Sequence, residues 1–329
     1  MEQLAKDAFT ADVKQHIFND LGIEEKSVKS LGGFESFVFA RPAINTILRI
    51  THISHRDEFQ IQGELAFIKH LCLAGAAVCK PIAFNDGALV RRIDEFVITQ
   101  FQRAPGDIVT PDNWNDSLFY TWGRHIGEFH KAAQSFKQSE FKRFDWQQDE
   151  NLDFRKRIPG DQKILLGKAD ACLAEIGALP KNDDIYGLIH CDAHYKNFFF
   201  DEGKLTFFDF DDCCYQWFVF DVATILFGVV LMPEVANTRR AQEAEVHRFL
   251  PAFLQGYHSE FPVSSFMLEN LSLFLKAREL SMYAVIHAHM DVNDIRDSFP
   301  RKLMLDRQRR IEAGEPYLDM DFMQFMPNA

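Results

Sequence analysis

The residues best suited to chemistry lie in one stretch of the sequence, from His190 to Asp212. An apolar run that reads as a buried strand leads into a polar loop with Asp192 and Asn197, and two further short apolar runs end at Asp209. The polar turn between those two runs predicts a hairpin. Because a hairpin returns its ends to one place, we expect Asp192 and Asn197 near Asp209. An aspartate base, an asparagine oxygen and a second aspartate suit the positioning of a hydroxyl and Mg²⁺ beside a transferring phosphoryl group.

This stretch resembles the catalytic and metal loops of a known family. The pattern His-x-Asp-x-x-x-x-Asn, followed by Asp-Phe-Asp, is similar to that of the aminoglycoside phosphotransferase and choline kinase family, which includes bacterial phosphotransferases and has a protein-kinase-like fold. The resemblance implies that Asp192 orients or deprotonates an acceptor hydroxyl, and that Asn197 and Asp209 hold Mg²⁺. It also implies that Asp221 braces the catalytic loop, with His190 behind Asp192. The signal is specific because order, spacing and structural context agree.

The first hundred residues predict five strands and one principal helix, over 57–72, after a weaker helical stripe over 2–18. Gly32 and Gly33 lead into the first alternating run, and their turn could let backbone N–H groups approach phosphates. Most such glycine pairs are only turns. The position of this pair, early in the chain, matches the nucleotide-covering loop of the resembled family.

Arg49 lies in the middle of a predicted strand, where a charge costs desolvation free energy unless it has a partner. Glu64 flanks the buried stripe of the principal helix and is a candidate partner. In the resembled family a strand lysine pairs with a helix glutamate and with the nucleotide phosphates. Arg49 therefore departs from the family, although its planar fork also grips carboxylate or phosphate. The alternative is an ordinary edge-strand arginine with a surface glutamate nearby.

Gln100, Phe101 and Gln102 precede a turn-rich segment that, by resemblance, is the hinge where backbone groups meet the adenine. The predicted domains are a nucleotide-binding lobe over 1–102 and a catalytic and acceptor-binding helical lobe over 103–329. Helices of the second lobe are predicted over about 118–136, 161–177, 218–232, 238–257, 265–290 and 300–313. The fold class is α+β, bilobal and protein-kinase-like, with a small antiparallel-sheet N-lobe and a mainly helical C-lobe.

Composition narrows the class of partner. The chain has 329 residues and a net charge of −12, from 36 basic and 48 acidic residues. This charge argues against nucleic acid, which needs a basic footprint, and favours a cationic acceptor. None of the six cysteines forms a C-x-x-C pair, so paired zinc sites are not expected. The sequence has no signal-peptide pattern and no apolar run long enough to span a bilayer, so we expect a cytoplasmic protein without a membrane partner.

Two other readings compete. His190, Asp192 and His194 alternate with period two, so on a strand they would share one face and could hold the metal of a hydrolase. A nucleotide-binding pseudokinase is the other, because Arg49 replaces the lysine and Cys191 stands where the family usually has glycine. The favoured function is an ATP- or GTP-dependent phosphotransferase that uses Mg²⁺. Its expected acceptor is a small hydroxyl compound bearing an amine: an aminoglycoside, an amino alcohol or a homoserine-like amino acid. A sugar or a protein serine is an alternative acceptor.

Overall fold

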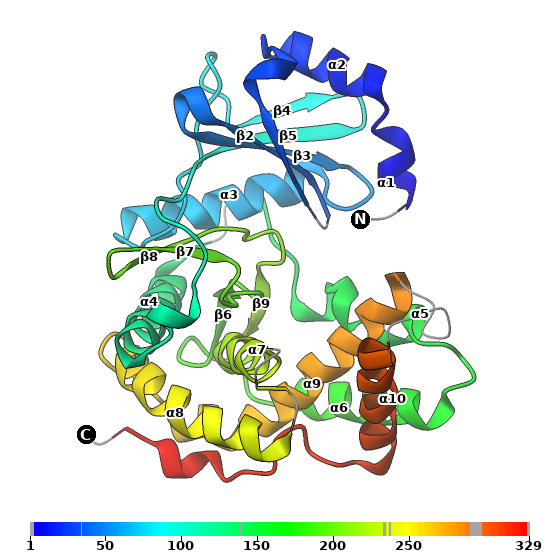
Figure 1. The fold of residues 1–329 in the computed structure, drawn as a ribbon, viewed down its shortest axis with the longest axis vertical. Coiled ribbons are helices and arrows are strands. Elements are labelled where there is room, and N and C mark those ends of the chain that lie inside the picture. Colours follow the sequence, from blue (N-terminus) through cyan, green and yellow to red (C-terminus); the bar gives the residue numbers. More distant parts are fainter. Residues whose placement is uncertain are drawn as a thin grey trace. The chain divides into compact units, whose positions relative to one another are not determined.

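The computed structural model describes residues 3–33, 35–137, 140–232, 235–236, 238–289 and 298–327. Contacts within the chain divide it into two compact units, each described by itself below (Figure 1). The first unit comprises Met1–Asp107, Phe136–Arg143 and Phe198–Asp211. The second comprises Ile108–Ser135, Phe144–Asn197 and Asp212–Ala329. The boundary at residue 102 stays a prediction.

A five-stranded sheet forms the centre of the first unit, with every neighbouring pair antiparallel and the order β1-β2-β3-β5-β4. Its strands are β1 (Lys29–Gly32), β2 (Phe37–Arg41), β3 (Thr46–His52), β4 (Val90–Ile93) and β5 (Phe96–Gln102). Successive strand residues face opposite sides of a sheet. Leu48 and Ile50 accordingly join the apolar core, whereas Arg49 between them faces helix α3 (Glu58–Leu73). The five predicted strands and the principal helix are confirmed.

The expected helix over 2–18 is two helices, α1 (Gln3–Ala8) and α2 (Ala11–Asp20). The break falls at Thr10, whose hydroxyl accepts the backbone N–H of Val13 and caps the second helix. Ile17 and Phe18 of α2 are fully buried in the core that Leu48 and the other sheet residues form. The N-cap at Thr10 therefore starts a new helix although the apolar stripe continues across it. The prediction of a single helix is wrong.

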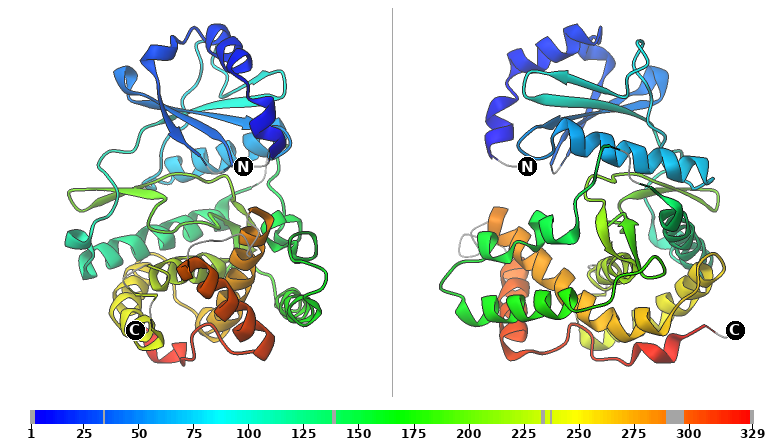
Figure 2. Two further views of the ribbon diagram at one scale, coloured as in Figure 1. Left: turned by 45° about the vertical axis from the view of Figure 1, so that its right-hand side comes forward. Right: turned by 180° about the vertical axis from the view of Figure 1, so that it is seen from behind.

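The second unit is mainly helical. Its helices are α4 (Asp116–Ser135), α5 (Phe154–Arg157), α6 (Lys163–Gly177), α7 (Phe218–Val230), α8 (Arg239–His258), α9 (Ser265–His289) and α10 (Ser298–Ala313). All six predicted helices are present; residue 290, the predicted end of one, lies outside the described residues. Helix α7 is nearly apolar all round and almost wholly buried, and α9 runs alongside it (Figure 2).

Helices α4 and α8 lie side by side because each carries a glycine at the contact (Figures 1 and 2). A Cβ on Gly123 of α4 would meet the carbonyl oxygen of Phe253 at 1.9 Å. A Cβ on Gly256 of α8 would meet the carbonyl oxygen of Tyr120 at the same 1.9 Å. The two backbones therefore approach to a distance that no larger side chain permits.

Two short strand pairs carry the loop with the candidate catalytic residues. Strand β6 (Tyr186–Ile189) pairs antiparallel with β9 (Cys214–Trp217), and β7 (Phe198–Asp201) pairs with β8 (Lys204–Phe207). The β7–β8 pair is the predicted hairpin, with positive φ at Glu202 and Gly203 as a type I′ turn requires. Strand β9 was not predicted, because four residues of mixed polarity give no periodic signal. Among the described residues no helix is long and apolar enough to cross a membrane.

Candidate active site

The loop that follows β6 is anchored by a buried aspartate. Asp221, in the first turn of α7, accepts the backbone N–H of Cys191 at 2.7 Å and that of His190 at 3.2 Å. It also contacts Nε2 of His130 at 3.1 Å, and the other ring nitrogen of His130 contacts the Tyr257 hydroxyl at 2.8 Å. A carboxylate with no exposed surface needs such partners. The prediction that Asp221 braces this loop is confirmed.

Within the loop, Asp192 and Asn197 form one hydrogen-bonded unit. The Asn197 amide nitrogen donates to Oδ2 of Asp192 at 3.0 Å and to its backbone oxygen at 2.8 Å. The backbone N–H of Asp192 donates to Nδ1 of His190 at 3.3 Å, so His190 lies behind it as expected. Since the nitrogen of the Asn197 amide is used here, its oxygen, the atom that Mg²⁺ prefers, remains to bind a ligand.

His194 lies beside Asp192 in the same loop. Burial lowers the pKa of His194, and the opposing charge of Asp192 does not reverse this. Its Nδ1 accepts the backbone N–H of Lys196 at 3.2 Å, so the proton of the neutral ring is on Nε2. Nε2 lies 3.4 Å from Oδ2 of Asp192.

The strand that the metal-hydrolase reading required does not exist. Strand β6 ends at Ile189, and residues 190–194 form a loop, so the period-two argument fails. His190 and His194 each accept a backbone N–H, and Asp192 binds Arg278, whose Nη2 lies 2.7 Å from Oδ1. This arrangement is a hydrogen-bonded loop in which both histidines already have partners. Arg278 was not singled out from the sequence.

Cys191, one of the two departures from the resembled family, has a backbone φ of +66°. Glycine adopts this region freely, whereas other residues there carry strain. The Cys191 thiol is buried and lies 3.3 Å from the thiol of Cys214. The cysteine therefore keeps the left-handed backbone that a glycine would adopt, rather than displacing the loop.

In the first unit, Arg49 and Glu64 form a buried, two-pronged ion pair. Nη1 and Nη2 of Arg49 lie 2.9 and 2.6 Å from the two carboxylate oxygens of Glu64. Arg49 is 6% exposed and Glu64 0%, so the edge-strand alternative is wrong. Burial alone would lower the pKa of Arg49, but the charge and hydrogen bonds of Glu64, with Asp211 and Asp209, outweigh it and raise the pKa.

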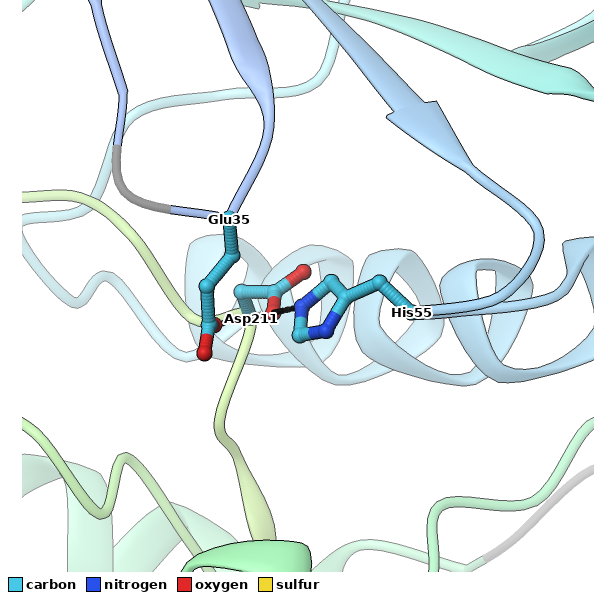
Figure 3. A group of neighbouring side chains, drawn as sticks. All are labelled: Glu35, His55 and Asp211. Carbon is cyan, nitrogen blue, oxygen red and sulfur yellow. Dashed lines mark hydrogen bonds and ion pairs between the residues drawn. The ribbon is translucent and has the colours of Figure 1, made fainter. Parts of the chain in front are cut away.

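Asp211 is the centre of a second cluster in the same unit (Figure 3). Its carboxylate lies 2.5 Å from Nε2 of His55, 3.7 Å from Arg49 and 3.6 Å from Arg56, while Glu35 is 3.2 Å from His55. Burial alone would raise the pKa of Asp211, but these cations hold it well below its usual range. No pattern in the sequence singled out His55, Arg56 or Glu35.

Glu35, His55 and Asp211 offer metal-type ligand atoms within 4.8 Å of one another, the one such group among the described residues. Burial alone would lower the pKa of His55, but the charge and hydrogen bond of Asp211, with a hydrogen bond to Glu35, raise it to about 10. A protonated imidazole donates hydrogen bonds and cannot ligate a cation. With two arginines also beside Asp211, this group forms an ion-pair network.

The turn between β1 and β2 requires its second glycine. Gly32 and Gly33 have φ of +83° and +137°, and a Cβ on Gly33 would lie 1.9 Å from the carbonyl oxygen of Ser36. The Ser36 hydroxyl is in turn 2.8 Å from that of Thr51 on β3. Phe34, within the predicted nucleotide-covering loop, lies outside the described residues. The role of the two glycines in nucleotide binding stays a prediction.

The three predicted hinge residues lie at the end of β5. Oε1 of Gln100 accepts a hydrogen bond from Nη1 of Arg41 at 2.8 Å. The Arg49 guanidinium lies 5.1 Å from the centre of the Phe101 ring. The backbone oxygen of Gln100 and the N–H of Gln102 already bond residues 80–82. The role of these three residues in adenine recognition stays a prediction.

Asp209, the remaining predicted ligand, belongs to the first unit, whereas Asp192 and Asn197 belong to the second. Its backbone φ is +66°, and its charge acts on Arg49 of the same unit. A non-glycine residue in this conformation is uncommon and is typical of functional sites. The closeness of Asp209 to Asp192 and Asn197 stays a prediction.

The fold and the braced Asp192 loop define a kinase-like phosphotransferase, and comparison with known proteins gives the family. A family model described as "Phosphotransferase enzyme family" matches residues 32–267. Amicoumacin kinase of Bacillus subtilis (strain 168) is 34% identical over 310 residues, which cover 92% of this chain and 91% of the relative. The chain belongs to the phosphotransferase enzyme family. It is an enzyme that moves a phosphoryl group to a hydroxyl of a small molecule.

Solved structures agree with this assignment. An amicoumacin kinase in complex with AMP-PNP, Ca²⁺ and Ami superposes with a TM-score of 0.90 at 27% identity, covering 98% of this chain and 99% of the other. A microcompartment-associated aminopropanol kinase gives 0.71 at 19% identity, covering 92% and 96%. Spectinomycin phosphotransferase gives 0.54 at 14% identity, covering 95% and 97%. The protein-kinase-like fold predicted from the sequence is confirmed.

Proposed function

We propose that the chain transfers the γ-phosphoryl group of ATP, or of GTP, to a hydroxyl of a small, amine-bearing acceptor. The observation that carries the proposal is the Asp192 loop, in which Asn197 holds the carboxylate and Asp221 holds the backbone. In the reaction, the acceptor oxygen bonds to the γ-phosphorus while the bond to the β,γ-bridging oxygen breaks and leaves the nucleoside diphosphate. Asp192 orients the hydroxyl and takes its proton.

Asn197 and Asp209 would hold Mg²⁺, because both offer the hard oxygen ligands that this ion prefers. The amide nitrogen of Asn197 is fixed on Asp192, which directs its oxygen to other partners. When bound, the metal would neutralise the charge that develops on the phosphates. The relative solved with AMP-PNP and Ca²⁺ supports a divalent ion of this kind.

Arg49, locked onto Glu64, would present its guanidinium to the nucleotide phosphates, with Gly32 and Gly33 covering them. Gln100, Phe101 and Gln102 would border the base. These roles follow from the family resemblance and are supported by the buried Arg49–Glu64 pair. We place the enzyme in the cytoplasm, where nucleoside triphosphates are abundant, and its six free cysteines are consistent with a reducing compartment.

Candidate acceptors are an aminoglycoside, an amino alcohol and a homoserine-like amino acid. The 34%-identical relative is named for amicoumacin, which makes that compound the first to test. The 19%-identical neighbour, named for aminopropanol, gives the second. The pseudokinase alternative is not retained, because the chain belongs to an enzyme family and Arg49 makes the expected pair with Glu64.

The test is a nucleoside-diphosphate release assay with ATP or GTP, Mg²⁺ and amicoumacin, run on the wild type, Asp192→Asn and Asp201→Asn. Asp201 is an exposed aspartate at the end of β7 and is a control for the loss of one charge. Asp192→Asn should lower kcat by at least about a hundredfold, with nucleotide binding by thermal shift unchanged. Full activity of Asp192→Asn would refute its role. Nucleotide binding without transfer to any of the candidate acceptors would contradict the proposed class of acceptor.

A further inference from the structure

Arg278 reaches Asp192 from a distant part of the chain. It lies on α9, and its Nη2 donates to Oδ1 of Asp192 at 2.7 Å. The opposite oxygen, Oδ2, already accepts a hydrogen bond from the amide nitrogen of Asn197. Nε2 of His194 lies 3.4 Å from the same oxygen. A carboxylate has about four lone-pair positions, so room for an acceptor hydroxyl remains. That hydroxyl must approach Asp192 with the guanidinium of Arg278 as its immediate neighbour.

The guanidinium has binding capacity that the protein does not use. Nε of Arg278 is buried and has no hydrogen-bond partner among the residues that the structure describes. An unpaired buried donor costs free energy, and a ligand oxygen can recover it. The side chains of Arg278 and Asp192 are 14% and 22% exposed, so both can be reached from solvent. An arginine fork offers donors to carboxyl, carbonyl and hydroxyl oxygens and repels ammonium groups.

The charges around Asp192 also favour a neutral or anionic ligand group over an ammonium group. Asp192 and Arg278 form an ion pair, so their charges largely offset each other. The net charge of −12, which favoured a cationic acceptor, therefore does not describe the surroundings of Asp192. Asp211, one of the acids behind that expectation, is already balanced by His55 and two arginines.

We propose that Arg278 is an acceptor-binding residue that selects compounds with a neutral or anionic oxygen on the carbon next to the reacting hydroxyl. This proposal rests on the proposed function and refines it. An amine on the acceptor then lies away from the reacting hydroxyl. Arg278 binds the neighbouring oxygen, and the same guanidinium keeps Asp192 directed at the hydroxyl proton.

The first experiment measures amicoumacin phosphorylation by Arg278→Gln, Arg278→Lys and Lys276→Gln. Lys276 is a matched control, a half-buried cation on the same helix two residues away. Arg278→Gln should lower kcat/KM for amicoumacin by at least about tenfold, as loss of a charged hydrogen bond implies, with KM for ATP unchanged. Arg278→Lys should recover part of the lost kcat/KM. In a further variant, Arg278→Ala, added guanidinium should restore phosphorylation of amicoumacin. A merely structural arginine would not show this rescue.

The second experiment tests the class of acceptor with three compounds that share one hydroxyl-bearing skeleton. They are 1-aminopropan-2-ol, lactamide and lactate, with charges of +1, 0 and −1, each measured as a competitor of amicoumacin phosphorylation. The wild type should bind lactamide and lactate more tightly than the amine, and Arg278→Gln should lose this order. Preference of the wild type for the amine, or an unchanged order in the variant, would overturn the proposal.

The outcomes separate this proposal from the proposed function. A wild type that phosphorylates amicoumacin, with Arg278→Gln behaving like Lys276→Gln, would overturn the role of Arg278 alone. A wild type that shows neither nucleotide-dependent thermal shift nor transfer would overturn the proposed function, and the role of Arg278 with it.

Discussion

The buried pair between Arg49 and Glu64 allows a quantitative test of how the first unit is held together. Glu64→Met would leave a guanidinium that is 6% exposed without the carboxylate that meets it at 2.6 and 2.9 Å. Removing one partner of a buried ion pair costs about 3–5 kcal/mol. Asp211 lies 3.7 Å from Arg49 and keeps part of the compensation, so we expect the lower end, about 3 kcal/mol.

The assay is chemical denaturation of four proteins: the wild type, Glu64→Met, Arg49→Met and the double variant. Replacing both partners of a buried pair by apolar residues is often close to neutral. The double variant should therefore be more stable than Glu64→Met, with a coupling energy well above the experimental error.

An exposed pair provides the control for this cycle. Arg155 and Asp170 form an ion pair with side chains 70% and 42% exposed, so Asp170→Met should cost at most about 1 kcal/mol. The reasoning fails if Glu64→Met costs no more than Asp170→Met, or if the double variant is less stable than both singles.

Two further predictions concern the first unit. Gly33→Ala should weaken nucleotide-induced thermal stabilisation, because its Cβ would lie 1.9 Å from the Ser36 carbonyl oxygen; Gly160→Ala, with open space around it, should not, and equal behaviour would contradict the prediction. The pKa of His55 is raised to about 10 by Asp211, so its contribution to unfolding free energy is complete below its unfolded pKa of about 6.5 and is lost as pH rises toward 10. The stability difference between wild type and His55→Gln should therefore shrink over that range, and a constant difference would contradict it.

Local patterns in the sequence predicted the elements that hold the site. The Asp192 loop follows a buried strand and precedes a hairpin, and both are short-range signals that the structure confirms. The partner of Arg49 was also predictable, because a charge within an apolar strand needs a nearby opposite charge and Glu64 was available. These inferences succeed where neighbours in sequence are neighbours in space.

Other parts of the site depend on contacts between distant segments. Arg278 is 86 residues from Asp192 in the sequence, and nothing in the pattern of its helix marks it. The His55–Asp211 contact joins residues 156 apart. Strand β9 was missed for a similar reason, because its pairing with β6 is visible only once the chain has folded. A long-range side-chain contact leaves no periodic trace in the sequence.

The path of the chain between its two contact units limits how this enzyme can be recombined. The chain passes from one unit to the other at residues 107–108, 135–136, 143–144, 197–198 and 211–212. The β7–β8 hairpin is bonded into the first unit, where the Phe207 carbonyl accepts the N–H of Cys79. A chimaera with one junction after β5 would therefore join one parent's sheet to the other parent's hairpin. Such a chimaera would replace hydrogen-bonding partners that the native first unit holds together.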